Sequence, residues 1–274
     1  MADECDVSKT VTSFLLNTCR LCPRLTSRSV QAALCCGVLM DDEEADLIPL
    51  ITGSVAEFYI EPMLPLVGDI DLMCHDNITL AIPRGYPPPT QLPAEFNNYV
   101  RVAEIIDSHL PGYVYLQLRY LLTECIDSCK YNYVRCDKTQ YLQQTSTLTA
   151  GDNHGPAVLN DYKSPQLLPA DHVYCVRCLA WPPQATGWPT RHRNYGWPDS
   201  ATLDRVVNNG CDVVGVAHRQ CRQLESFGKF QWRLSFSRAE IVLINGWMPL
   251  QQIVYHMLRY FIKTQQNNRK CYFD

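Results

Sequence analysis

A glycine–serine pair and two closely spaced aspartates are the residues of this sequence best suited to chemistry. Fourteen residues separate Gly53-Ser54 from Asp69-Ile70-Asp71. Aspartates at i and i+2 of a strand share one face, where two carboxylates give hard oxygen ligands to Mg²⁺ or Mn²⁺. A Gly-Ser turn offers backbone N–H groups and a hydroxyl to a triphosphate. The pattern indicates phosphoryl or nucleotidyl transfer; the alternative is a surface turn and two solvated aspartates.

Two short apolar segments must position these groups. Residues 47–51 predict a strand that ends at the Gly-Ser turn, and residues 67–73 predict the strand that carries the aspartates. Residues 113–122 fit a strand or a buried helix. The remaining predicted strands are 156–159, 172–179 and 211–217; the predicted helical segments are the first 40 residues, interrupted near Pro23, then 201–207 and 238–263; the predicted loops are 84–93 and 139–155.

Composition restricts the class of protein. The chain has 274 residues, of which 46% are hydrophobic, so it can bury a sizeable core. Its apolar runs are shorter than the roughly 20 residues that a membrane-spanning helix needs. Asp3, Glu4 and Asp6 stand where a signal peptide has basic and then apolar residues, which predicts a cytoplasmic protein. The 14 cysteines are therefore expected to be reduced thiols, with few or no disulfides.

The modest net charge of −4 conceals an asymmetry along the chain. Residues 1–150 have 10 basic and 19 acidic side chains, whereas residues 151–274 have 14 and 9. Basic residues in the second half could contact nucleic-acid phosphates without reading bases; the candidates are Arg191, Arg193, Arg219 and Arg222. A solvated basic face and an arginine-lined nucleotide pocket are the alternatives. Trp181, Trp188 and Trp197 could stack on bases or pack a loop against the core.

Two C-x-x-C pairs have the spacing of a zinc or redox site: Cys19-x-x-Cys22 and Cys175-x-x-Cys178. If residues 172–179 form a strand, Cys175 and Cys178 point to opposite faces and cannot bind one metal together. Buried thiols are the favoured interpretation. No G-x-S-x-G or similar signature supports a hydrolase.

Three segments in order resemble the Mab-21 and cGAS-like nucleotidyltransferases. GSVAEFYIEPMLPLVGDIDLM (53–73) is similar to their active-site segment, in which a Gly-Ser and a nearby Glu precede paired acidic residues. HGPAV (154–158) with DHVYCVRCLAWPPQATGWP (171–189) resembles the strand pair with the third metal carboxylate and the Trp-Pro loop. QWRLSFSRAE (231–240) resembles the segment that opens their helical lobe. The resemblance covers residues 47 to 263, approximately.

The resemblance implies a role for each matching position. Asp69, Asp71 and Asp171 would be the catalytic residues and the ligands of two Mg²⁺ or Mn²⁺ ions, and Asp171 would also orient the attacking hydroxyl or receive its proton. Gly53 and Ser54 would hold the triphosphate, with Glu57 near it, and Arg233 and Ser235 would approach the base or phosphates of a bound nucleotide. Independently of the family, the alternation of residues 171–175 suits a strand beside the Asp69–Asp71 strand, although Pro169-Ala170-Asp171 also suits a turn.

The implied fold is α/β (α+β), a nucleotidyltransferase core with a mixed, mainly antiparallel sheet flanked by helices, plus the beginning of a C-terminal helical lobe. The expected division is a helical scaffold (1–46), the core (47–230) and an incomplete lobe (231–274), because the lobe extends further in the family.

The implied activity is the joining of ATP and/or GTP into a cyclic dinucleotide in innate immune signalling. Double-stranded RNA, held by Arg191, Arg193, Arg219 and Arg222, is the implied activator. The rival interpretations are an inactive truncated form and a non-catalytic Mab-21-like scaffold or binding protein.

Overall fold

The structure, a computed structural model, describes residues 27–40, 47–56, 70–125, 127–144, 153–154, 157–160, 169–193, 196–218, 221, 228–248, 250–255, 257–258 and 262. Within these ranges the labelled helices are α2 (Ser27–Met40), α3 (Gly53–Ala56), α5 (Ser200–Asn208) and α7 (Ser237–Asn245), with the 3₁₀ turn η2 (Pro183–Ala185); residues 250–255 and 257–258 are also helical. The strands are β1 (Leu47–Thr52), β2 (Ile70–Pro83), β3 (Tyr99–Asp107), β4 (Tyr113–Cys125), β5 (Lys130–Tyr141), β6 (Asn153–His154), β7 (Ala157–Asn160), β8 (Ala170–Cys178), β9 (Cys211–Val214) and β10 (Gln231–Ser235).

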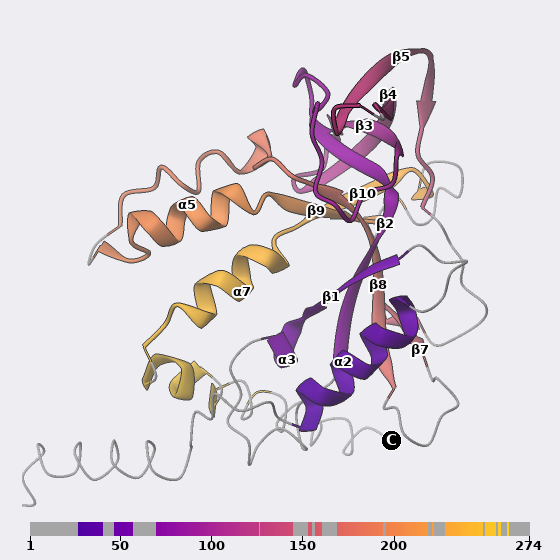
Figure 1. Ribbon diagram of the computed structural model, residues 1–274. Helices are drawn as coiled ribbons and strands as arrows, with labels where there is room; N and C mark the ends of the chain where they lie inside the picture. The colour runs from indigo at the N-terminus through magenta and orange to yellow at the C-terminus, as the bar shows by residue number, and fades with distance from the viewer. Residues whose placement is uncertain are drawn as a thin grey trace, which may run out of the picture.

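All ten described strands belong to one mixed sheet in the order β1-β2-β3-β4-β10-β9-β8-β7-β6, with β5 beside β4 (Figure 1). Only the pairings of β2 with β3 and with β8 are parallel; the other described pairings are antiparallel. Because β2 pairs on both sides, six strands close on one another: β2, β3, β4, β10, β9 and β8. The predicted fold class, an α/β fold with a mixed and mainly antiparallel sheet flanked by helices, is confirmed.

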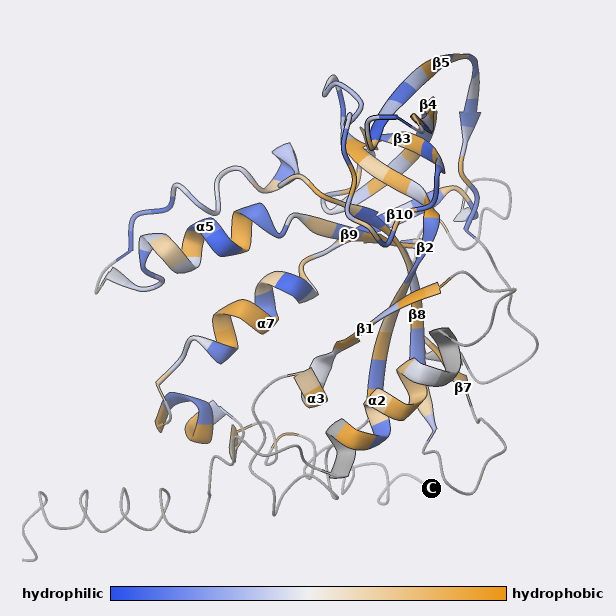
Figure 2. Cartoon of the chain, in the orientation of Figure 1, coloured by the Kyte–Doolittle hydropathy of each residue, from blue (hydrophilic) through white to orange (hydrophobic). Residues whose placement is uncertain are grey.

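Two of the apolar clusters among the described residues hold the strands that carry the aspartates. The first lies inside the closed ring and draws side chains from all six strands, among them Ala103, Leu116, Val176, Val213 and Leu234. The second lies under α2, whose Ala32 and Cys35 pack against alternate residues of β2, including Ile70, Leu72 and Cys74. Figure 2 shows mainly hydrophilic residues along β5, which pairs with β4 outside the ring. The long strand β2 therefore belongs to both cores and fixes the position of its first residues.

The local pattern predicted several elements at their observed places. Strands were found where residues 47–51, 156–159, 172–179 and 211–217 predicted them, and α5 where residues 201–207 predicted a helix. The ambiguous segment 113–122 is strand β4. Three further outcomes are corrections: the Gly-Ser turn begins the short helix α3, the predicted loop 139–155 contains the end of β5 and all of β6, and the predicted helix 238–263 is interrupted when α7 ends before Gly246. Pro23 lies outside the described residues.

The segment QWRLS, expected to open the helical lobe, is a strand of the sheet. β10 lies between β4 and β9 and therefore completes the ring. Helix α7 follows this strand directly, and the expected three-part division of the chain stays a prediction. No helix in the described ranges combines the length and the apolarity needed to cross a membrane.

Candidate active site

The first residues of β2 and β8 bring two of the predicted metal ligands together. The strands run parallel, and Asp71 is the register partner of Asp171. Partners on adjacent strands have Cα atoms about 4.8 Å apart, and their side chains project from the same face. Both aspartates are half-buried. The opposite face of β2, with Ile70 and Leu72, is covered by α2, so the carboxylates lie on the face that α2 leaves open.

Gly53 lies directly against the Asp71 side chain. β1 pairs antiparallel with β2, and Thr52 is the register partner of Asp71. The Thr52 hydroxyl donates a hydrogen bond to the Asp71 carbonyl over 3.3 Å. Immediately afterwards Gly53 adopts φ +58°, which favours glycine. A Cβ at this position would collide with Asp71 Oδ2 and lie 2.9 Å from the carboxyl carbon. Glycine is therefore required by both the backbone conformation and the close approach of the carboxylate.

Ser54 follows in the first turn of α3, next to this contact. Its backbone is described, but its side chain, like Asp69 and Glu57, lies outside the described residues. The structure thus brings together Gly53, Asp71 and Asp171, with Ser54 adjacent in the chain.

Arg233 reaches the same face of the sheet from β10. Cys175 of β8 is the partner of Val214 in β9, and Val214 is the partner of Arg233. Residues 171 and 175 lie on one face because side chains alternate, so Arg233 shares that face with Asp171. It lies two strands away, about 10 Å, and four residues further along, about 13 Å. Exposed Arg233 is too far to share a metal ion with Asp171 but is placed for the remote end of an extended ligand.

Ser235 also lies on the face of the sheet that carries Asp171, two residues beyond Arg233 on β10. Arg177, Asp212 and Ser235 are successive partners across β8, β9 and β10, on the face that carries Asp171. Ser235 is half-buried, and its hydroxyl lies 3.2 Å from the Ser237 hydroxyl at the start of α7.

A buried group of charged side chains lies between the two ends of this face. Asp212 is fully buried and accepts a hydrogen bond from Arg238 Nε at 2.8 Å, which ties α7 to β9. Arg177 Nη1 donates to the carbonyls of Cys178 at 2.7 Å and Cys211 at 2.8 Å. Burial lowers the pKa of the nearby His75, so its neutral form is favoured. This group was not predicted from the sequence, although the charge of Asp212 within the apolar run CDVV was a signal for it.

The helix α7 also contacts the glycine–serine turn. Asn245 Nδ2 donates to the carbonyl of Ala56, the last residue of α3, over 3.2 Å. Helix α7 is therefore fixed at its first turn by Asp212 and at its last residue by α3. The face that carries Asp71 and Asp171 is bordered by both helices.

Comparison with known proteins identifies the domain that carries this arrangement. Residues 114–246 match the sequence model of the Mab-21 protein nucleotidyltransferase domain. These residues belong to the Mab-21 family. The matched part of the Mab-21 domain includes Asp171, Arg233 and Ser235, whereas Gly53 and Asp71 precede it. No curated protein matches the chain.

The donor atoms of the two aspartates suit a divalent cation with oxygen ligands. Asp71 and Asp171 supply two carboxylates from adjacent strands, and Mg²⁺ and Mn²⁺ prefer such ligands. The described residues contain no group of three His, Cys, Asp or Glu side chains arranged for a metal. The third predicted ligand, Asp69, is not among them, so the complete ligand set stays a prediction.

The C-x-x-C pair of the Mab-21 domain is not a zinc site. β8 continues through Cys178, so Cys175 and Cys178 point to opposite faces, as the strand prediction required. Cys175 packs with Met73 and Val214, whereas Cys178 lies inside the closed ring. Both are buried thiols. Cys19 and Cys22 lie outside the described residues.

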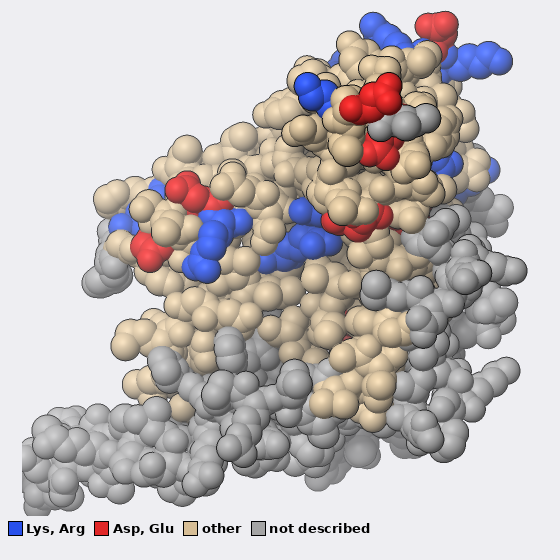
Figure 3. Space-filling view, viewed as in Figure 1, with Lys and Arg blue, Asp and Glu red and all other residues tan. Residues whose placement is uncertain are grey.

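The arginines predicted to contact nucleic acid differ in what their side chains contact. Arg191 is exposed. Arg193 instead donates to the carbonyls of Trp188 at 2.6 Å and Pro189 at 3.1 Å and stacks over the Trp188 ring, 4.9 Å from its centroid. These contacts of Arg193 therefore stabilise the loop after β8 that contains Trp181 and Trp188. Arg219 and Arg222 lie outside the described residues. On the face drawn in Figure 3, the described basic side chains form small groups interspersed with acidic ones.

Proposed function

We propose that this Mab-21 protein is a metal-dependent nucleotidyltransferase that joins ATP and/or GTP into a cyclic dinucleotide. The reaction needs two transfers: in each, a 3′- or 2′-hydroxyl attacks an α-phosphate, a new P–O bond forms, the bond to the β-phosphate breaks, and pyrophosphate leaves, and the second transfer closes the ring. The observation that carries the proposal is the register of β2 and β8, in which Asp71 lies opposite Asp171 beside Gly53.

The carboxylates have two tasks in this proposal. Asp71 and Asp171, with Asp69, hold two Mg²⁺ or Mn²⁺ ions, which when bound would activate the attacking hydroxyl and stabilise the charge on the leaving pyrophosphate. Asp171 also orients that hydroxyl or accepts its proton, since it stands on the strand next to the other ligands. Burial of the sheet's opposite face against α2 keeps the two strands in register.

The remaining predicted site residues position the substrate. The backbone at Gly53 and Ser54 binds the triphosphate, and its contact with the Asp71 carboxylate would bring phosphate and metal together. Glu57 follows in the chain near this turn. Arg233 and Ser235, on the same face but farther along the sheet, bind the base or phosphates of the nucleotide.

Activation by double-stranded RNA is the finer part of the proposal, in the setting of innate immune signalling. It is supported by the resemblance and by the excess of basic residues after residue 150. Exposed Arg191, with Arg219 and Arg222, would contact phosphates, and shape recognition of the duplex would need no base-specific motif. Arg193 would support this surface through the loop that it holds.

Incubation of the full chain with labelled ATP and GTP tests the proposal, with Mg²⁺ or Mn²⁺ and with or without double-stranded RNA. A cyclic dinucleotide is expected, and Asp71→Asn and Asp171→Asn should each reduce its yield at least about 100-fold, the scale of removing one electrostatic stabiliser. Asp137→Asn, at an exposed position on β5, is the matched control. Absence of product under every condition would favour the scaffold alternative.

The RNA part has its own test. Arg191→Glu with Arg222→Glu should abolish stimulation by RNA, whereas Lys138→Glu with Arg135→Glu on the exposed strand β5 should not. Both pairs change the net charge equally, so equal losses would attribute the effect to overall charge and overturn the assignment.

A further inference from the structure

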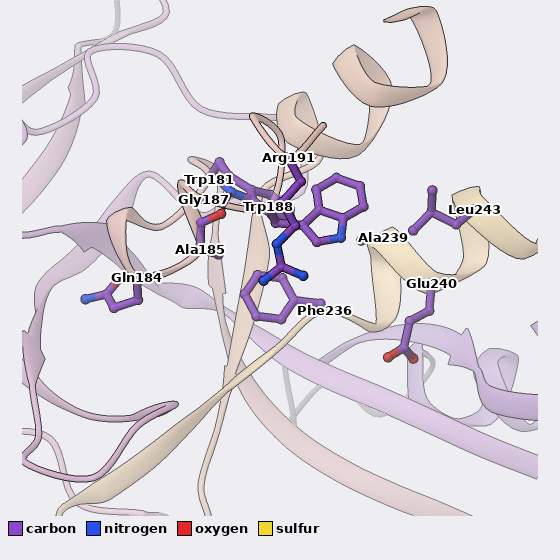
Figure 4. A pocket seen from close by; sticks show the side chains of 10 residues that line it. All are labelled: Trp181, Gln184, Ala185, Gly187, Trp188, Arg191, Phe236, Ala239, Glu240 and Leu243. Atoms are coloured by element: carbon purple, nitrogen blue, oxygen red, sulfur yellow. Dashed lines mark hydrogen bonds between the residues drawn. The ribbon is translucent and has the colours of Figure 1, made fainter. Parts of the chain in front are cut away.

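A second concave site lies away from the aspartates, between the loop after β8 and the start of α7. It has a volume of about 380 Å³, within the range of small-molecule sites. It is lined by residues of the loop and of the α7 segment, among them Trp181, Trp188, Arg191, Phe236, Glu240 and Leu243 (Figure 4).

This pocket and the paired aspartates are far apart. Asp171 stands near the beginning of β8, and the strand continues to Cys178 before the chain reaches Trp181. Seven residues of extended strand span about 23 Å. A mononucleotide bound in the pocket is therefore too short to reach the aspartates, and the pocket is separate from the positions of the predicted metal ligands.

Three aromatic rings form one wall of the pocket. The Trp181 and Trp188 rings have centroids 5.6 Å apart, and Trp181 lies 5.1 Å from Phe236. Trp181 Nε1 donates to the Ala185 carbonyl at 3.0 Å, and Arg193 stacks on Trp188, so both indoles are fixed. Fixed aromatic faces favour a planar ligand, because stacking then costs little conformational entropy.

Arg191 supplies the charge. Figure 4 shows its side chain extending into the pocket beside Trp188 and Phe236. The guanidinium makes no hydrogen bond or ion pair with any residue that the structure describes. Glu240, the one acidic lining residue, is exposed and in Figure 4 points away from the rings. A guanidinium beside aromatic faces repels cationic ligands and pairs with phosphate or carboxylate oxygens.

We infer that this pocket binds a nucleoside monophosphate, with its base against the aromatic wall and its phosphate on Arg191. The volume fits one nucleotide rather than two. The inference goes beyond the proposed nucleotidyl transfer and does not rest on it, because it involves none of the predicted metal ligands. Such a site would make the protein responsive to free mononucleotide at a place remote from the aspartates.

Binding of AMP and adenosine to the full chain in EDTA tests the inference, followed by calorimetry and tryptophan fluorescence. AMP should bind at least about tenfold more tightly than adenosine, and Arg191→Gln should remove that advantage while leaving adenosine affinity unchanged. Arg84→Gln, at another exposed arginine, is the matched control. Leu243→Trp, which fills the pocket, should abolish binding of both ligands.

The active-site aspartates separate this site from the catalytic one. AMP affinity in EDTA should be the same in Asp71→Asn as in the unmodified protein. The inference is overturned if AMP does not bind, if Arg191→Gln leaves its affinity unchanged, or if Asp71→Asn weakens it as much as Arg191→Gln does.

Discussion

Asp71 and Asp171 lie directly opposite each other on the parallel strands β2 and β8, which are far apart in the sequence. The register is continuous from Ile70 opposite Ala170 to His75 opposite Cys175. A slip of one residue would turn one carboxylate toward α2 and bring an apolar side chain to the open face. The apolar contacts of β2 with α2 therefore determine the geometry of the carboxylate pair as well as the stability of the sheet.

Gly53→Ala should abolish metal binding at the carboxylates. The added Cβ collides with the Asp71 carboxylate, and the residue must also keep φ +58°, which costs an L-residue about 1 kcal/mol or more. The measurement is the rise in melting temperature on adding Mn²⁺, which should disappear in the variant.

Gly85→Ala is the matched control for this prediction. Gly85 also has a positive φ, +79°, but a Cβ there meets nothing within 4 Å. Both variants should lose similar stability from backbone strain, and only Gly53→Ala should lose the response to Mn²⁺. An equal Mn²⁺ response in the two variants would show that the contact with Asp71 has no role in metal binding.

Local patterns predicted strands where the chain is largely apolar. Residues 47–51 and 172–179 are mainly apolar runs that predicted strands by their composition, and the expected neighbourhood of the Asp171 strand and the Asp71 strand is confirmed. β5 was missed because it is largely polar and exposed, and β10 because its five residues gain their strand character from β4 and β9. Such pairings join residues far apart in sequence, so no local pattern contains them.

The residues of the candidate site were likewise predicted from the sequence only in part. Gly53 and Asp71 were found from their types and spacing, but the reason for glycine became clear only from the approach of the carboxylate. Asp212 and Arg238 were missed because their partnership spans 26 residues and depends on the packing of α7 against β9. Arg193 was a candidate phosphate contact because of its charge. In the structure its guanidinium donates hydrogen bonds to the carbonyls of Trp188 and Pro189 in its own loop.

Arg238→Gln should destabilise the protein by about 3–5 kcal/mol, because it leaves the Asp212 carboxylate buried without its charged partner. Asp212 is fully buried, and its Oδ1 has no hydrogen-bond partner within the described structure, so no second donor compensates. Urea unfolding at pH 7 measures the loss. Adding Asp212→Asn should recover part of it, since the uncompensated charge is then removed.

The Glu104–Arg119 pair provides the comparison. It has the same 2.8 Å separation, but the Arg119 side chain is 27% exposed against 18% for Arg238, and Glu104 retains 10% exposure against none for Asp212. Arg119→Gln should therefore cost less, about 1 kcal/mol. Equal losses from the two arginine substitutions would mean that the burial of Asp212 does not determine the cost.

His172 should make the protein less stable in mild acid. Its side chain is 2% exposed, and burial lowers its pKa to about 4, whereas an unfolded histidine titrates near 6.5. Below pH 6.5 the unfolded chain binds a proton that the folded chain excludes, so stability falls as the pH decreases toward 4 and the loss is complete below that value. Between pH 7 and pH 5 this residue should cost about 1–2 kcal/mol.

The contribution of His172 can be separated from other titrating groups by comparing variants. His75 titrates in the same direction because burial lowers its pKa too, and half-buried Asp76 has a pKa raised by desolvation, so the total pH dependence is a composite. His172→Gln should reduce the stability difference between pH 7 and pH 5 by the stated amount, whereas His192→Gln, at an exposed position, should leave it unchanged. If both variants keep the full pH dependence, His172 is protonated within the fold, and the β8 face that packs with α2 accommodates a charge.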